Sequence, residues 1–299
     1  MRRKVVKLGP ATLVVSLPSK WIKKLGIKAG DEIDLEEQDK DLLIQAKAGH
    51  RLTKESIDLT GIDSLIKRIV ASKYLKGDDE IEIKIDSPEK ARLVQKRVNE
   101  LIGMEIIEQS KDRLLIKDMG GSSEDTFDSI IKRIVYLLNQ ISDESLKAIK
   151  NKETDLEYLE DMELNINRFT DYCFRLLNKK GYSDMKKTSV YYCLLFLLEE
   201  LGDEYKKLIS YINENKLRLS DDLVKDFSRI NNYQKDFEKL FLRFSYESAI
   251  NLAKERDRII NSINQKKESS KPREMEILNH FEGITDNIIK IMGQLLNIN

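Results

Sequence analysis

Two pairs of carboxylates with helical spacing are the residues of this sequence best suited to hold a cation. Glu199 and Asp203 are four positions apart, and so are Glu282 and Asp286. Residues at positions i and i+4 share one face of a helix, so each pair would present its oxygen atoms together. Hard oxygen ligands suit Mg, Mn or Fe. The sequence therefore predicts a divalent or ferric metal at these two pairs.

A metal-free arrangement of the same carboxylates is the alternative. Both pairs interrupt apolar helical patterns, and a carboxylate that is buried without a partner is costly. A lysine or arginine from a neighbouring helix would neutralise it as well as a metal would. The spacing alone leaves both readings open.

The first 30 residues carry basic side chains and no acid. The basic residues are Arg2, Arg3, Lys4, Lys7, Lys20, Lys23, Lys24 and Lys28. Residues 31–41 are strongly acidic, although the whole chain has a formal net charge of zero. A cationic run without counter-charges predicts a surface that binds nucleic-acid phosphates, and its alternative is an ordinary solvated face.

Length and composition indicate a multidomain, mainly helical protein. The 299 residues exceed one typical core and predict two or three domains. The chain is 40% hydrophobic and 35% charged with only 13 Gly and 4 Pro, a composition typical of long amphipathic helices. Apolar runs such as 194–198 are too short for a membrane span. Two cysteines and the absence of a signal peptide favour the cytoplasm.

No constellation of catalytic residues is recognisable. The two histidines, His50 and His280, are far apart in the sequence. Clustered carboxylates can hold catalytic metals, which keeps a metalloenzyme as a third class of function. We expect that the protein is not an enzyme.

Residues 1–47 predict a small β-rich module that requires a second copy. The expected elements are a strand at 5–6, a strand at 12–17, a helix capped by Ser19 and ended by Gly26, and strands at 32–35 and 42–46. So few residues cannot bury an adequate core alone. Obligate homodimerisation would supply the missing burial.

Three stretches of this module, residues 3–9, 13–18 and 25–33, resemble the SpoVT–AbrB family, which includes transition-state regulators and antitoxins. The resemblance implies a dimer with swapped hairpins that binds DNA through its N-terminal strand, loop and short helix. It assigns DNA binding to Arg2, Arg3, Lys4, Lys7, Lys20, Lys23 and Lys24. Ser16 stands where many relatives have an arginine, so the resemblance implies no contact with a base edge at this position.

The middle of the chain predicts a linker at residues 48–60 and a small α+β unit at residues 61–120. The unit would contain a helix at 62–75, a strand at 81–85, a helix from Ser87 to Ile102 and two further strands at 105–108 and 113–116. Ser87 as cap and Pro88 at the first helical position mark the start of the second helix. The sequence indicates no function for this unit beyond that of a packing spacer.

Residues 121–299 predict about six helices in two repeats, at about 122–215 and 219–299. The pattern Glu-x-(Leu/Ile)-x-Asp recurs at 199–203 and 282–286, an offset of 83 residues. Two copies of one three-helix bundle are the simplest interpretation.

This region resembles PhoU, a phosphate-signalling family of two three-helix repeats with metal-binding Glu/Asp-x-x-x-Asp motifs. The resemblance rests on the two pentads and on residues 163–167 and 251–264. Asn167 and Ala253 stand where that family has acids, so its metal motifs are incomplete here. Both domains in one chain resemble archaeal-type phosphate uptake regulators.

These patterns predict a homodimeric, DNA-binding transcriptional or signalling regulator of phosphate uptake with a helical sensor domain. A second hypothesis keeps the fold and removes DNA. In it the N-terminal module only dimerises, and the helical domain acts by contact with a phosphate transporter or a signalling kinase.

Overall fold

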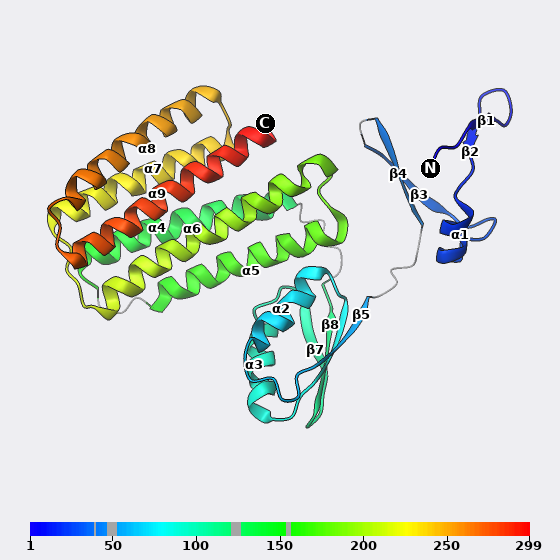
Figure 1. Ribbon diagram of the computed structural model, residues 1–299, viewed down its shortest axis with the longest axis horizontal. Coiled ribbons are helices and arrows are strands. Elements are labelled where there is room, and N and C mark those ends of the chain that lie inside the picture. Colours follow the sequence, from blue (N-terminus) through cyan, green and yellow to red (C-terminus); the bar gives the residue numbers. More distant parts are fainter. Residues whose placement is uncertain (39, 47–52, 121–126, 154–156) are drawn as a thin grey trace. The chain divides into compact units, whose positions relative to one another are not determined.

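The computed structural model describes residues 1–38, 40–46, 53–120, 127–153 and 157–299 (Figure 1). The chain divides into two compact units, Met1–Leu52 and Thr53–Asn299. The predicted order, small N-terminal hairpins followed by a mostly helical region, is confirmed. No helix in the described ranges is long and apolar enough to cross a membrane.

The first unit consists of two hairpins and one short helix. Strands β1 (Val5–Lys7) and β2 (Leu13–Val15) pair antiparallel, and so do β3 (Ile33–Gln38) and β4 (Asp41–Ala46). Helix α1 (Ser19–Leu25) lies between the hairpins and ends at Gly26, whose φ of 70° is left-handed as predicted. The expected cap at Ser19 is wrong, because Ser19 is already helical and Pro18 takes the cap position without a side-chain hydrogen bond.

The second unit begins with a four-stranded sheet covered by two helices. Its elements are β5 (Lys54–Asp58), α2 (Ile66–Lys76), β6 (Glu80–Lys84), α3 (Pro88–Val98), β7 (Met104–Gln109) and β8 (Arg113–Asp118). The strand order is β5-β6-β8-β7, and β5 runs parallel to β6. The Ser87 hydroxyl caps α3 by accepting a 3.3 Å hydrogen bond from the backbone of Lys90.

The structure corrects the linker predicted at residues 48–60. Residues 53–60 belong to the α+β unit, because β5 is an edge strand whose Ile57 pairs with Ile83 of β6. Ile57 is the only apolar residue of β5, so the segment has the composition of a linker. Its strand conformation depends on pairing with a distant strand. Residues 48–52 lie outside the described residues.

Six long helices follow, and they form one core. They are α4 (Phe127–Asn151), α5 (Glu157–Lys180), α6 (Thr188–Glu214), α7 (Asp221–Leu242), α8 (Tyr246–Lys267) and α9 (Pro272–Ile298). A short 3₁₀ turn, η1 (Met185–Lys187), precedes α6. Helices α4, α5 and α6 pack on one another, as do α7, α8 and α9. Extensive contacts of α6 with α9 and of α4 with α7 join the two sets.

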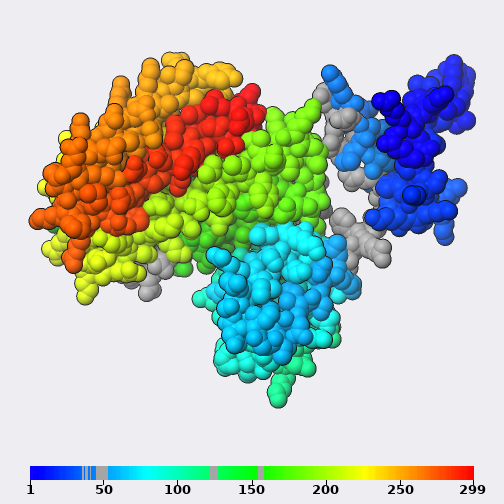
Figure 2. Space-filling view, in the orientation of Figure 1, coloured from blue at the N-terminus to red at the C-terminus, as the bar shows by residue number. Residues whose placement is uncertain are grey.

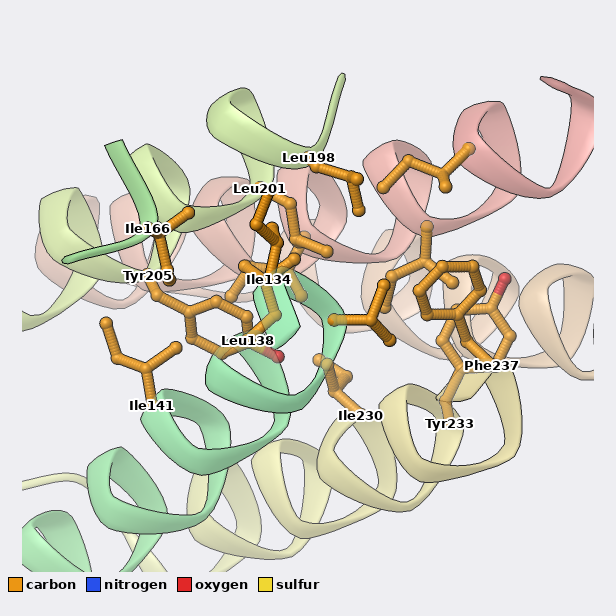
Figure 3. Packing of buried hydrophobic residues seen from close by; sticks show 14 of the residues in the cluster. Ile134, Leu138, Ile141, Ile166, Leu198, Leu201, Tyr205, Ile230, Tyr233 and Phe237 are labelled. Atoms are coloured by element: carbon orange, nitrogen blue, oxygen red, sulfur yellow. The ribbon is translucent and has the colours of Figure 1, made fainter. Parts of the chain in front are cut away.

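Buried side chains from both sets interdigitate (Figure 3). Leu138 of α4, Leu201 of α6 and Ile230 of α7 are all fully buried. The hydroxyl of Tyr205 is also buried and bonds to Ser142 at 3.0 Å, which satisfies this polar group in an apolar setting. In the space-filling view the helical region presents closely packed side chains on the face in view (Figure 2). The six helices therefore share one hydrophobic core.

Candidate functional site

The seven basic residues that the resemblance assigns to DNA binding are all exposed. Arg2, Arg3 and Lys4 precede β1, and Lys7 ends it. Lys20, Lys23 and Lys24 lie on α1 at i, i+3 and i+4 spacing, so they share one helix face. Within the described ranges, none of the seven makes an ion pair or a side-chain hydrogen bond. Their charges are therefore free to meet a polyanion.

The first unit has no buried side chain among those whose burial is described. Large apolar residues of its hairpins and helix lie open to solvent instead: Val5, Val6, Leu8, Leu13, Val15, Leu25, Leu35 and Leu42. Leu13 is 69% exposed and Val5 is 64% exposed. A folded module without an internal core must bury this surface against something else.

The first acidic pair lies beside a third carboxylate from α5. Glu199 and Asp203 are on α6, and Glu163 of α5 hydrogen-bonds with the Asp203 side chain. Glu163 also accepts hydrogen bonds from Lys206 Nζ at 2.9 Å and from Asn167 Nδ2 at 2.6 Å. Burial raises the pKa of Glu163, and Lys206 opposes this shift.

Glu199 is the most perturbed carboxylate of this group. Burial is the largest cause and raises its pKa to about 7, and the negative charge of Asp171 adds to the shift. Within the described ranges no cation pairs with it. Burial thus favours the neutral form of this carboxyl group.

The second acidic pair is already neutralised by α8. Arg256 donates to Asp286 Oδ1 from Nη2 at 2.7 Å and from Nε at 3.1 Å. Lys267, at the end of α8, pairs with Glu282. The two carboxylates do share one face of α9, but that face meets two cations.

These donor sets do not fit a metal ion. Within the described residues, no group of three or more His, Cys, Asp or Glu side chains is arranged to hold one. At Glu282 and Asp286 the positive charge that a metal would supply comes from Lys267 and Arg256. At Glu163 it comes from Lys206, whose Nζ lies 2.9 Å from the carboxylate.

Sequence reasoning missed the partners of these carboxylates. Arg256 lies in the segment 251–264, 30 residues from Asp286, and Lys267 is 15 residues from Glu282. Only the packing of α8 on α9 brings the cations to the carboxylates. The one local signal is Arg256 itself, a long cation on α8, the helix that precedes the second acidic pair in the sequence.

Comparison with known proteins adds one match. Residues 6–51 match the family model described as antidote-toxin recognition MazE, a bacterial antitoxin. This MazE-like module, residues 6–51, supports the AbrB-type resemblance predicted for the N-terminus. No curated protein and no solved structure matches the chain. The match covers about one sixth of the chain and does not reach the helical region, so the resemblance of that region to PhoU stays a prediction.

Proposed function

We propose that the protein is a homodimeric, DNA-binding regulator that uses the MazE-like module to hold DNA and the helical region to receive a signal tied to phosphate uptake. The observation that carries the proposal is the set of seven exposed cations of the first unit, none of them paired within the described ranges. Lysines and arginines without an ion-pair partner can neutralise the phosphates of DNA, and here they gather on one small module.

Dimerisation is the second element of the proposal. The first unit leaves its hairpin apolar residues exposed, and the two hairpins do not pair with each other within one chain. A second copy would cover these side chains and complete the sheets. Two copies would also double the number of cations presented to one duplex.

The contacts we propose are to phosphates. Lysine side chains position a protein on DNA without reading sequence, and Ser16 offers no bidentate partner for a guanine. Specificity for an operator would then come from shape or from the arginines, Arg2 and Arg3. Affinity should depend steeply on salt.

The link to phosphate uptake is supported by the helical region. Six long helices form two sets of three, and carboxylates repeat at equivalent positions, Glu199 and Asp203 on α6 and Glu282 and Asp286 on α9. This arrangement is the one that the resemblance to PhoU implies. In our proposal this region senses phosphate status without a bound metal at Glu282 and Asp286.

The test is binding of the full-length protein to DNA from upstream of the cell's phosphate-transport genes, at several salt concentrations, beside a scrambled duplex of equal length. We expect preference for the upstream DNA and a steep fall of affinity with salt. A variant with Lys20, Lys23 and Lys24 changed to Gln should reduce the slope of log K against log salt by up to about 3 per module. Lys254→Gln, an exposed cation on α8, is the matched control.

Equal and weak binding to both duplexes, with no effect of the triple substitution, would overturn the DNA proposal. The module would then serve only to dimerise, and the helical region would act by contact with a transporter or kinase.

A further inference from the structure

Two adjoining hollows lie at one end of the helical region, and no role has been assigned to them above. The first, about 440 Å³, is formed by the C-terminal ends of α4 and α6 and the turn after α6. The second, about 480 Å³, is formed by the same turn and the first residues of α7 and α9. Residues 217–219 line both, so the two hollows share a wall. Each has the volume of a small-molecule pocket.

The floor of both hollows is apolar. Ile212 lines the first, Leu223 and Ile277 line the second, and Leu217 and Leu219 line both. Leu217 and Leu219 are only partly buried, whereas the three others belong to the buried core. A ligand seated here would therefore meet hydrocarbon over most of its body.

The rim is strongly cationic. Five basic side chains stand around the two hollows, all exposed and none ion-paired within the described ranges: Lys152, Lys216, Arg218, Lys271 and Arg273. Two acids, Glu153 and Glu274, are among the described residues that line the hollows. Glu153 is hydrogen-bonded to Asn151 and Tyr158, and Glu274 accepts from the backbone N–H of Lys271. Among the described residues that line the two hollows, five cations thus stand beside two acids that already have hydrogen-bond partners.

Two of the cations occupy unusual backbone positions. Lys152 and Lys216 have left-handed φ angles of 57° and 48°. They follow α4 and α6 in the same motif: Glu153 N–H bonds to Ala148 O at 3.0 Å, and Leu217 N–H bonds to Ile212 O at 2.9 Å. Glycine is the residue that favours this position. A lysine at either position is less stable than a glycine would be, because its side chain disfavours a left-handed backbone. Each lysine does, however, add a positive charge to the rim.

We propose that these hollows form a binding site for a small amphipathic anion, an apolar body that carries one carboxylate or phosphate headgroup. The apolar floor would take the body, and Arg218 would meet the headgroup because it lines both hollows. The site is independent of DNA binding. Its ligand assay does not involve the N-terminal module, so either proposal can fail alone.

The experiment titrates the full-length protein with decanoate, below its micelle concentration, by calorimetry and by thermal unfolding. Decan-1-ol tests the apolar body without charge, and inorganic phosphate tests the charge without the body. We expect saturable binding of decanoate and a thermal midpoint that rises with its concentration. The two partial probes should bind at least 10-fold more weakly.

The variant for this test combines Lys216→Gly, Arg218→Gln and Arg273→Gln. All three positions are exposed, and glycine suits the backbone at position 216, so the fold should persist. The triple variant should bind decanoate at least 10-fold more weakly, and Lys254→Gln should bind it as the parent does. Urea midpoints equal to or above that of the parent would confirm that the variants are folded.

Three results would overturn the proposal. They are no decanoate binding, equal binding by the triple variant, or binding of decan-1-ol or phosphate as tight as that of decanoate. The first two would mean that the cationic rim holds no such ligand. The third would mean that the body and the headgroup are not recognised together.

Discussion

Arg175 of α5 donates a 2.7 Å hydrogen bond from Nη1 to the carbonyl oxygen of Tyr74, at the end of α2. Its Nη2 donates at 2.7 Å to Asp118, which ends β8, and its guanidinium lies 4.9 Å from the centre of the Tyr74 ring. The side chain is 2% exposed. The Tyr74 carbonyl also accepts a 2.9 Å hydrogen bond from the backbone of Gly77, so Arg175 adds a second donor at the end of α2 and pairs with a partly buried carboxylate. It joins the α+β part to the helical part within the second unit.

Replacing Arg175 with Met should destabilise the second unit by about 3 kcal/mol, because the carboxylate of Asp118 loses its closest cation in a poorly solvated position. Urea unfolding followed by circular dichroism measures this change. Arg92→Met is the control, because Arg92 pairs with Glu89 at 2.7 Å but both side chains are 69% exposed. An unchanged urea midpoint for Arg175→Met would show that Lys179, which also pairs with Asp79, is sufficient to join the two parts.

Glu199 should make stability fall as pH rises. Its pKa is raised from 4.5 to about 7 by burial. Between these values the native state binds more protons than the unfolded state, so the penalty is absent below about pH 4.5 and complete above about pH 7. The full effect is up to about 3 kcal/mol. Glu199→Gln should therefore be more stable than the parent at pH 8 and similar to it near pH 4.5, as measured by urea midpoints.

The control for this prediction is Glu268→Gln, an exposed position at the end of α8. It should leave the pH dependence of the parent unchanged. Parallel pH profiles for the parent and Glu199→Gln would contradict the prediction and would mean that the pKa of Glu199 is the same in the folded and unfolded states.

Metal removal should leave the helical region unaffected. Asp286 and Glu282 already pair with Arg256 and Lys267, so a chelator has no cation to remove there. Asp286→Asn should cost about 1 kcal/mol, because the ion pair is partly exposed. The loss should be the same with and without EDTA. Unfolding midpoints that rise with added Mn²⁺ in the parent but not in Asp286→Asn would contradict this prediction and would support a metal site at Glu282 and Asp286.

The oligomeric state should depend on the exposed apolar residues of the first hairpin. Leu13 pairs with Lys7 across the β1–β2 ladder and is 69% exposed. Leu13→Asp should convert a dimer to a monomer, because a buried interface would have to accommodate a charge. Light scattering after size exclusion measures this. The urea midpoint of the second unit should not change. A parent chain that is monomeric at all concentrations would contradict the dimer proposal.

Local signals in the sequence predicted some elements well. Gly26 ends α1 and Ser87 with Pro88 starts α3, because these residues act on their own backbone neighbours. Strand β5 was missed, because a segment with one inward apolar residue becomes a strand only beside β6. Helix α3 ends at Val98, earlier than Ile102, because Leu101 turns back to bond with Val98 at 2.9 Å.

The residues of the candidate site also divide into those that local sequence predicts and those that depend on tertiary packing. The exposed cations were predictable, since a charge run without acids needs no tertiary information. The ionisation state of Glu199 was not, because it depends on burial between helices and on Asp171 of α5. The neutralisation of Asp286 by Arg256 was not predictable either, because 30 residues separate the two.

The repeat in the sequence suggests two halves that could open independently. The hydrophobic core that they share predicts instead that they open together. Since α4 packs on α7 and α6 on α9, neither three-helix set retains a closed core without the other. Their buried amides should exchange with deuterium through one opening event with one free energy. The duplicated pattern therefore produces a single cooperative folding unit.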